Sequence, residues 1–271
     1  MQKTVKRRIW KWIKIVAAIY IVLGIAFYFL QNKFLFHPKK LPADYNFSFA
    51  QPFKEVNLPV TDEKNINIVQ FTVPDSIRKG VVLYFHGNRN NIERYAQYAP
   101  HFTRNNYDVW MVDYPGYGKS TGELTEEEVY KDATIVYKMA KSAIHTDSII
   151  IYGKSLGSGI AAYLASRGDC KKLILETPYS SIDDLVSNYA FIYPVSELVK
   201  YHFPVKEYLE HVAAPIYLLH GTNDEVISYR HSKNLKKLYP SKIELTGIEK
   251  GKHNNLADFP QFQTKIDSLL R

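Results

Sequence analysis

Six continuous apolar runs constrain the fold of this 271-residue chain more than any other feature of its sequence. They are "GVVLYFHG", "YDVWMVDY", "DSIIIYG", "KKLILETP", "APIYLLHG" and "KIELTGI". Runs of this kind are typical of strands buried on both faces, as in a parallel sheet covered by helices. Helix-like segments accompany them at 90–105, 125–142, 156–167, 228–239 and 254–270. This alternation predicts an α/β fold with a mostly parallel, doubly wound sheet and helices on both faces.

Two further segments precede the alternation and have a different pattern. "FKEVNLPV" and "INIVQFTV" alternate polar and apolar residues on either side of the turn "TDEKN", which predicts an antiparallel hairpin and brings the sheet to eight strands. Thr125 followed by Glu128 predicts a capping box at the start of the helix at 125–142. Residues 179–212 interrupt the alternation with an aromatic-rich, helix-prone insertion, which suits a short helical cap over the carboxyl edge of the sheet.

The N-terminal segment has the composition of a membrane anchor. Residues 15–30, "IVAAIYIVLGIAFYFL", carry no charge, and residues 9–13 extend the apolar stretch to about the 20 residues that cross a bilayer. A cleaved signal peptide shares this pattern, but no small-residue cleavage site follows the apolar core. A buried core helix is the third interpretation. Basic residues crowd the side before the span, which predicts a cytoplasmic N-terminus and a catalytic domain on the extracytoplasmic side.

These features divide the chain into three parts. Residues 1–32 are predicted to form a basic cytoplasmic tail and a single transmembrane signal anchor, 33–52 a linker, and 53–271 the α/β domain with its cap at 179–212. Much of the net charge of +8 lies in the first fourteen residues, so a nucleic-acid partner is not expected. The single cysteine, Cys170, excludes an internal disulfide and a cysteine-based metal cluster.

The sequence Gly-Lys-Ser-x-Gly occurs twice, at 118–122 and at 153–157. Neither copy has the glycine five positions earlier that a phosphate-binding loop requires, so nucleotide binding is not supported. A catalytic serine in Gly-x-Ser-x-Gly needs an abrupt strand-to-helix turn. Only the second copy has this setting, because "SIIIY" leads into it and "IAAYLAS" follows it. Ser155 is therefore the candidate nucleophile, and Ser120 is expected to be a turn residue.

A serine nucleophile needs a base and an acid that orients the base. His253, in the loop after the last strand, and Asp224, after the strand before it, lie where ligands bind sheets of this type. Their order along the chain, Ser155, Asp224, His253, is the order expected for this fold. Glu176 is an alternative acid because it ends the preceding strand.

The other histidines and acids near strand ends are given structural roles. His86 and His220 stand in His-Gly pairs at strand exits and are expected to pack and to bond turns. Asp113 is expected to fix its own loop, and Glu225 to point away from the site. The six remaining histidines are expected to be solvated or to cap helices: His37, His101, His145, His202, His211 and His231.

Two backbone N–H groups are expected to stabilise the oxyanion that forms on the substrate. Leu156, directly after the nucleophile and at the start of a helix, supplies one. Asn88, in the loop after "VVLYFHGN", supplies the other, and its side chain is not required for that role.

With these residues placed, the chain resembles the α/β-hydrolase fold family across about residues 53–271. It is most similar to the serine-aminopeptidase-like and acyl-protein-thioesterase-like branch with a short cap. The matching pieces are "YFHGN", "VDYPGYGKSTG", "GKSLGSGIA", "TPYSSIDDL", "PIYLLHGTNDEVI" and "GKHNN". The resemblance implies hydrolysis through an acyl-enzyme without a metal or an organic cofactor. Lys154 departs from the residue types common at its position, and it either favours anionic substrates or packs and pairs beneath the turn.

The leading hypothesis is a membrane-tethered serine hydrolase that cleaves a carboxylic ester or thioester of a small or lipid-like acyl substrate. A serine peptidase of the same mechanism is the second hypothesis. A non-catalytic binding protein on a hydrolase scaffold is the third, but a binding protein has no need to keep all three catalytic groups.

Overall fold

The computed structural model describes residues 2–187 and 192–271. Within these residues, eight strands form one sheet in the order β10-β9-β8-β7-β4-β6-β3-β2, in which the pairs β2–β3 and β3–β6 are antiparallel and the others are parallel. Their bounds are β2 Phe53–Pro59, β3 Asn65–Phe71, β4 Gly80–Phe85, β6 Tyr107–Val112, β7 Ile149–Lys154, β8 Lys172–Glu176, β9 Ile216–Gly221 and β10 Ile243–Ile248. The predicted eight-stranded, mostly parallel sheet with an N-terminal hairpin is confirmed.

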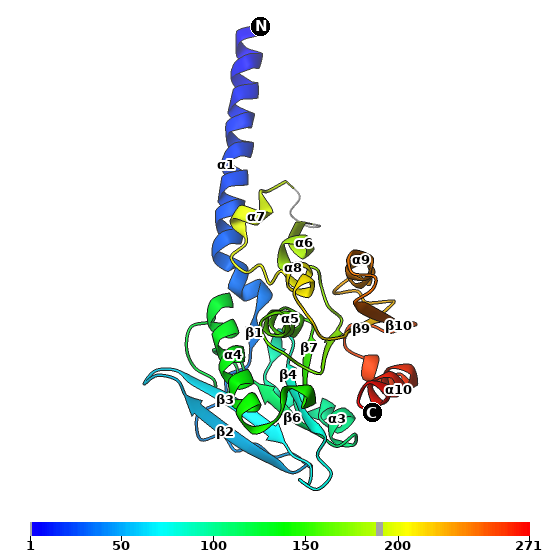
Figure 1. The fold of residues 1–271 in the computed structure, drawn as a ribbon. Helices are drawn as coiled ribbons and strands as arrows, with labels where there is room; N and C mark the ends of the chain where they lie inside the picture. The colour runs from blue at the N-terminus through cyan, green and yellow to red at the C-terminus, as the bar shows by residue number, and fades with distance from the viewer. Residues whose placement is uncertain (1, 188–191) are drawn as a thin grey trace.

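Helices cover both faces of the sheet (Figure 1). One face packs against α4 (Glu126–Ala143), α5 (Gly157–Arg167), α8 (Val205–Glu210) and α9 (Arg230–Leu238). The other face packs against α2 (Ile92–Tyr95), α3 (Pro100–Thr103) and α10 (Pro260–Leu269). Along β4, alternate residues enter opposite cores and all are buried, which explains why these strands are apolar throughout.

Two predicted helices are interrupted by proline. The segment at 90–105 breaks into α2, a 3-10 turn at Ala96–Tyr98 and α3, which begins at Pro100. Proline lacks the N–H that a continuous helix needs, but it is well placed at a first helical position. The segment at 254–270 likewise begins with a 3-10 turn at Leu256–Asp258, and α10 starts at Pro260. A further 3-10 turn, Thr146–Ser148, precedes β7.

The predicted capping box at the start of α4 is only half formed. The Thr125 hydroxyl accepts a hydrogen bond from the Glu128 N–H at 3.2 Å, as a cap should. The Glu128 carboxylate binds the Lys64 ammonium at 2.6 Å instead of returning to the Thr125 N–H. That N–H bonds the Glu123 carbonyl. A cation brought from the β2–β3 hairpin outcompetes the local capping bond.

Residues 179–212 contain three short helices on the carboxyl side of the sheet (Figure 1). These are α6 (Ile182–Ser187), α7 (Val195–Leu198) and α8, which also packs on α5. Residues 188–191 of the predicted cap lie outside the described residues. The apolar side chains of α6 face the carboxyl edge and reach the serine turn, as the pocket below demonstrates.

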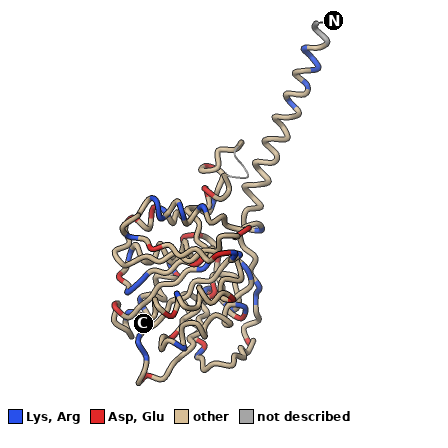
Figure 2. The backbone as a smooth tube through the Cα atoms, turned by 90° about the vertical axis from the view of Figure 1, so that its right-hand side faces the viewer, with Lys and Arg blue, Asp and Glu red and all other residues tan. Residues whose placement is uncertain are grey.

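Helix α1 (Gln2–Leu35) projects from the domain (Figures 1 and 2). Its stretch from Val5 to Leu35 is long and apolar enough to cross a membrane, and almost none of it is buried in the protein. The chain then forms a two-stranded parallel ladder, β1 (His37–Pro38) on β5 (Arg89–Asn90). The exposure of α1 excludes the interpretation that this segment is a core helix.

The connection from β7 to α5 brings the helix against the sheet at contact distance. A Cβ atom added to Gly157 would lie 2.0 Å from the carbonyl oxygen of Phe85 in β4. A Cβ atom on Gly153 would lie 2.4 Å from the carbonyl oxygen of Gly157. Only glycine fits at these two positions, because the opposing atoms belong to the backbone and not to side chains that could turn away.

We predict that Gly157→Ala lowers the free energy of unfolding by about 3 kcal/mol, because the new methyl group must displace β4 backbone. Gly116→Ala is the matched control, since its φ is +81° but no atom lies within 4 Å of the added Cβ. Strain alone should cost this control about 1 kcal/mol. Chemical unfolding of both full-length variants in detergent measures the difference, and equal losses would contradict the close-approach argument.

Candidate active site

Ser155 occupies a strained turn between β7 and α5. Its φ is +53°, a left-handed conformation that non-glycine residues rarely adopt. The Ser155 N–H donates to the carbonyl of Glu176 at 2.8 Å, which fixes the turn to the end of β8. This backbone conformation is typical of functional residues held by the surrounding structure. Here it turns the hydroxyl away from the sheet toward the loops after β9 and β10.

The structure brings Ser155, His253 and Asp224 into one hydrogen-bonded line. Nε2 of His253 lies 3.0 Å from Oγ of Ser155, and Nδ1 lies 2.8 Å from Oδ2 of Asp224. The serine follows β7, the aspartate follows β9 and the histidine follows β10, so three loops at the carboxyl edge supply them. All three residues are buried. An imidazole in this position can accept the serine proton while the carboxylate orients it.

Asp224 is held as a carboxylate. Burial raises its pKa, but hydrogen bonds with His220 and His253 and from the Ile227 N–H outweigh burial and hold the pKa well below its ordinary value. Oδ1 accepts the N–H groups of Val226 and Ile227, each at 2.8 Å. An ionised acid at this point favours a protonated His253 during reaction.

His220 contributes more than the predicted packing and turn bonding. Its Nε2 lies 2.8 Å from the Ile227 carbonyl and 3.2 Å from Oδ2 of Asp224, and its Nδ1 lies 2.7 Å from the Ser232 hydroxyl. The side chain is fully buried. Because His220 ends the same strand four residues before the acid, the spacing in "HGTND" was the available signal for this contact.

Glu176 does not orient His253. Its carboxylate is buried with the Lys154 ammonium and also accepts the Tyr152 hydroxyl. The Lys154 ammonium further lies 5.1 Å from the centre of the Tyr98 ring. This pairing supports the second interpretation of Lys154, in which it pairs beneath the turn, because its charge is neutralised and it does not line the pocket described below.

Most of the other residues assigned structural roles make hydrogen bonds to the loop around Asp113. His86 lies 3.2 Å from Oδ1 of Asp113, and the same oxygen accepts the Ile92 N–H at 2.9 Å, so Asp113 fixes its surroundings as predicted. Ser120 is also a turn residue, because its hydroxyl donates to the Asp113 carbonyl at 2.7 Å. His231, expected to be solvated or capping, is instead buried beside Ser180.

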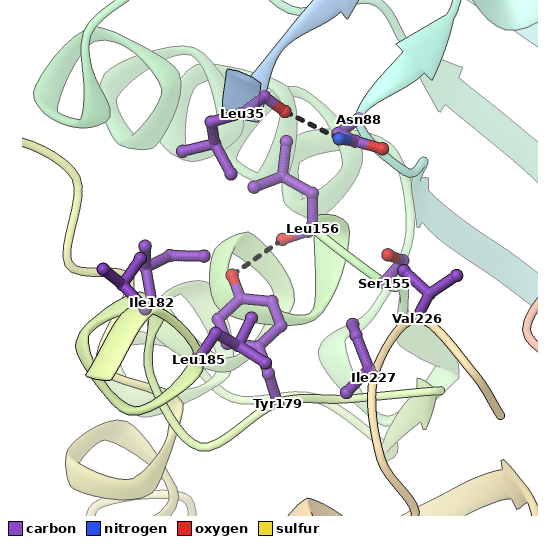
Figure 3. Close-up of a pocket in the computed structure, with 10 residues that line it drawn as sticks. Leu35, Asn88, Ser155, Leu156, Tyr179, Ile182, Leu185, Val226 and Ile227 are labelled. Carbon is purple, nitrogen blue, oxygen red and sulfur yellow. Dashed lines mark hydrogen bonds between the residues drawn. The ribbon is translucent and has the colours of Figure 1, made fainter. Parts of the chain in front are cut away.

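The predicted oxyanion donors lie beside the serine (Figure 3). Within the described residues, neither the Asn88 N–H nor the Leu156 N–H donates a hydrogen bond to the protein. The Asn88 side chain has another partner, since its amide donates to the Leu35 carbonyl at the end of α1 at 2.6 Å. The loop that carries one predicted donor is thus bonded directly to the N-terminal helix.

An apolar cavity of about 250 Å³ opens next to the serine (Figure 3). Its lining comes from α1, the β4 loop, the serine turn, the cap and the β9 loop: Leu35, Asn88, Ser155, Leu156, Tyr179, Ile182, Leu185, Val186, Val226 and Ile227. The Tyr179 hydroxyl donates a hydrogen bond to the Leu156 carbonyl at 3.2 Å. The cavity therefore suits a hydrocarbon group attached to the carbon that the serine attacks.

Residues 76–204 match the family model described as serine aminopeptidase, S33. Among curated proteins, the chain is 28% identical over 197 residues to alpha/beta hydrolase domain-containing protein 17C of Xenopus tropicalis. That alignment covers 70% of this chain and 61% of the relative. The chain thus spans about three fifths of the length of the relative it matches.

Two esterase structures are similar in fold. A Pyrococcus furiosus esterase has a TM-score of 0.66 at 18% identity, covering 87% of this chain and 97% of that one. Est1E of Butyrivibrio proteoclasticus, solved with ferulic acid bound, has a TM-score of 0.64 at 17% identity, covering 79% and 96%. These neighbours share the fold of this chain, and the family model is that of a hydrolase family. The chain has the α/β-hydrolase fold, and its residues 76–204 are similar to the serine aminopeptidases of family S33.

Proposed function

We propose that this protein is a membrane-anchored serine hydrolase that cleaves a carboxylic ester or thioester through an acyl-enzyme intermediate. One observation carries the proposal: a continuous hydrogen-bonded line runs from Ser155 through His253 to an ionised Asp224, beside an apolar cavity. Each member of the line matches a role that nucleophilic catalysis requires. Esterases among the structural neighbours agree with this reaction class.

The reaction follows from the positions of these atoms. Nε2 of His253 takes the proton of Ser155 as Oγ bonds the carbonyl carbon, and the resulting oxyanion faces the N–H groups of the two oxyanion residues. His253 then gives the proton to the leaving oxygen or sulfur, and that bond breaks to leave an acylated Ser155. Water next attacks the acyl carbon and gives a proton to His253. The proton returns to Oγ as the carboxylic acid departs.

A peptidase of the same mechanism is the second candidate, because the family model is named for serine aminopeptidases. An aminopeptidase binds the positively charged amino group of its substrate, for which a carboxylate is the natural partner. Among the described residues, none of those lining the cavity beside Ser155 is an aspartate or glutamate. The apolar lining therefore favours an acyl group over an aminoacyl group.

The proposed anchor is α1, with its N-terminus in the cytoplasm and the catalytic domain on the extracytoplasmic side. Basic residues concentrate at its N-terminal end (Figure 2), which is the arrangement that keeps this end inside. Gln31 and Phe36, at the other end, are buried against the domain. Removal of the segment by cleavage after the apolar core would expose the surface that these residues cover.

We expect a fluorophosphonate probe to label the full-length protein at Ser155. Ser155→Ala and His253→Ala should each abolish labelling, because the first removes the nucleophile and the second its base. Ser120→Ala is the matched control, since it changes the serine of the other Gly-Lys-Ser-x-Gly copy and should still be labelled. In-gel fluorescence measures the outcome, and unchanged labelling of His253→Ala would refute the assigned base.

Substrate preference separates the two candidate functions. We expect p-nitrophenyl esters of medium chain length to be hydrolysed faster than aminoacyl p-nitroanilides, because the cavity is apolar and carries no acid. Comparison of kcat/KM for the two series decides the question. A preference for the anilides would favour the peptidase, and neither turnover nor labelling would favour a binding protein.

The low pKa of Asp224 predicts an acid-dependent loss of stability. A carboxyl whose pKa falls on folding stabilises the native state above its unfolded pKa, near about 4, and this contribution is lost as the pH falls below that value. The free energy of unfolding should therefore decline in this range, and less steeply for Asp224→Asn. Asp44→Asn, which changes an exposed carboxyl, is the control, and its free energy of unfolding should decline with falling pH as steeply as that of the wild type. Identical slopes for all three proteins would contradict the assignment.

The proposed topology predicts that the catalytic domain of the protein in sealed membranes is protected from protease added to the cytoplasmic side. Protease added to the extracytoplasmic side should digest the domain, while protease added to the cytoplasmic side should remove only the basic tail. An immunoblot against a C-terminal tag detects both results. Digestion of the domain only from the cytoplasmic side would reverse the proposed orientation.

A further inference from the structure

The cap is bound along the apolar stretch of α1 by a pair of tyrosines. The rings of Tyr20 and Tyr193 stack with centroids 4.4 Å apart and an interplanar angle of 11°. The Tyr20 hydroxyl donates to the Ile192 carbonyl at 3.0 Å, and the Tyr193 hydroxyl donates to the Tyr20 carbonyl at 2.9 Å. Gly24, one turn further along α1, provides the space for the Tyr193 ring, which a Cβ atom would approach to 3.1 Å.

The same segment of the cap is bound to α1 again near the domain. The Gln31 amide donates to the Leu198 carbonyl at 2.6 Å, and its oxygen accepts the Lys200 N–H at 2.8 Å. The Lys200 ammonium lies 4.2 Å from the centre of the Tyr28 ring. Because an α-helix rises 1.5 Å per residue, about 16 Å of α1 separates this contact from Tyr20. The segment from Ile192 to Lys200 therefore runs alongside α1.

The charges of α1 determine how much of it lies in the hydrocarbon layer. Residues 15–32 are uncharged and lie between Lys14 and Lys33, and they span about 27 Å, close to the roughly 30 Å thickness of that layer. If the hydrocarbon layer instead ended at Tyr20, an equal length of helix before it would place six basic residues in hydrocarbon (Lys3, Lys6, Arg7, Arg8, Lys11 and Lys14). Each costs about 3 kcal/mol at the centre of a bilayer. Figure 2 shows these charges before the long uncharged part of the helix.

We infer that the cap segment from Ile192 to Leu198 sits in the bilayer beside α1, and that the cavity next to Ser155 takes the acyl chain of a substrate held in that bilayer. The partner of this surface is the lipid bilayer itself. The substrate class, an ester or thioester of a membrane-resident acyl chain, rests on the proposed function. The inferred depth of the cap in the bilayer does not depend on the proposed function.

The side chains of the segment are distributed as this position requires. Ile192, at the end that lies along the middle of the apolar stretch, is 58% exposed. Glu197 and Lys200, the two charged residues between Ile192 and Lys200, lie at the end bound near Gln31, where the headgroups begin. An apolar tip and a charged base match a depth gradient from hydrocarbon to headgroup.

The cavity lies at the foot of this membrane-facing assembly. Leu35, the last residue of α1, forms part of its wall, and Ile182 and Leu185 of the cap form another part. Val226, which also lines it, is 61% exposed. An acyl chain that leaves the bilayer between α1 and the cap therefore reaches Ser155 through apolar surroundings, without crossing water.

The depth of the cap tests the inference directly. We would label Ile192→Cys with an environment-sensitive fluorophore in the Cys170→Ser background and place the full-length protein in phosphatidylcholine vesicles with brominated acyl chains. The bromolipid should quench this dye and aqueous iodide should not. Ile77→Cys, 49% exposed and just before β4 at the opposite edge of the sheet, is the matched control and should give the reverse pattern.

Iodide quenching of both dyes, with no effect of the bromolipid, would overturn the inference. If Ile192→Cys does not fold, Ser196→Cys, exposed on α7, provides the same measurement. Two ester probes extend the test to the substrate: a soluble butyrate ester and a long-chain ester embedded in the same vesicles. We expect Ile192→Asp to lower kcat/KM for the embedded ester at least about tenfold, because a charge is disfavoured in hydrocarbon, and to leave the butyrate ester unaffected.

The outcomes separate the two proposals. No hydrolysis of the butyrate ester by the wild type would refute the proposed function, while the quenching result would still decide the position of the cap. Hydrolysis of both esters, with no selective loss in Ile192→Asp, would refute delivery from the bilayer and leave the hydrolase proposal standing.

Discussion

The contact between α5 and the sheet at the β7–α5 turn is the constraint on which the rest of the site depends. Because a Cβ atom on Gly157 would collide with the β4 backbone, the helix begins closer to the sheet than any other residue type allows. The chain reaches this helix only through a sharp turn, and Ser155 takes the left-handed conformation with φ of +53°. The hydroxyl is then fixed in position before any substrate binds, which limits the reorganisation that catalysis requires.

Two buried carboxylates at the ends of neighbouring strands have different roles because of their partners. Glu176 lies against the Lys154 ammonium beneath the turn, so its charge is used within the protein. Asp224 meets two imidazoles and two backbone N–H groups, none of which carries a permanent full charge. In the proposed reaction, a carboxylate in this second environment keeps a net negative charge for the imidazolium that forms on His253.

Much of this arrangement could be predicted because it depends on short-range patterns. Apolar runs that are buried on both faces define the sheet, and the order of strand ends brings Ser155, Asp224 and His253 to one edge. The break of the helix at 90–105 was also visible in principle, since Pro100 marks it. For the contact of His220 with Asp224, the spacing in "HGTND" was the one signal, because the contact itself depends on how the loop after β9 folds back.

The least predictable part of the site is the role of the N-terminal helix. Its composition indicates a membrane span, but nothing in the pattern indicates that Leu35 lines the cavity or that its carbonyl binds Asn88. Both contacts join residues more than fifty positions apart, which the pairing of β1 with β5 brings together. As a result, the segment proposed to anchor the protein is also part of the wall next to the nucleophile. In the proposed arrangement, the distance from the bilayer to Ser155 is set by hydrogen bonds within the fold and not by a flexible tether.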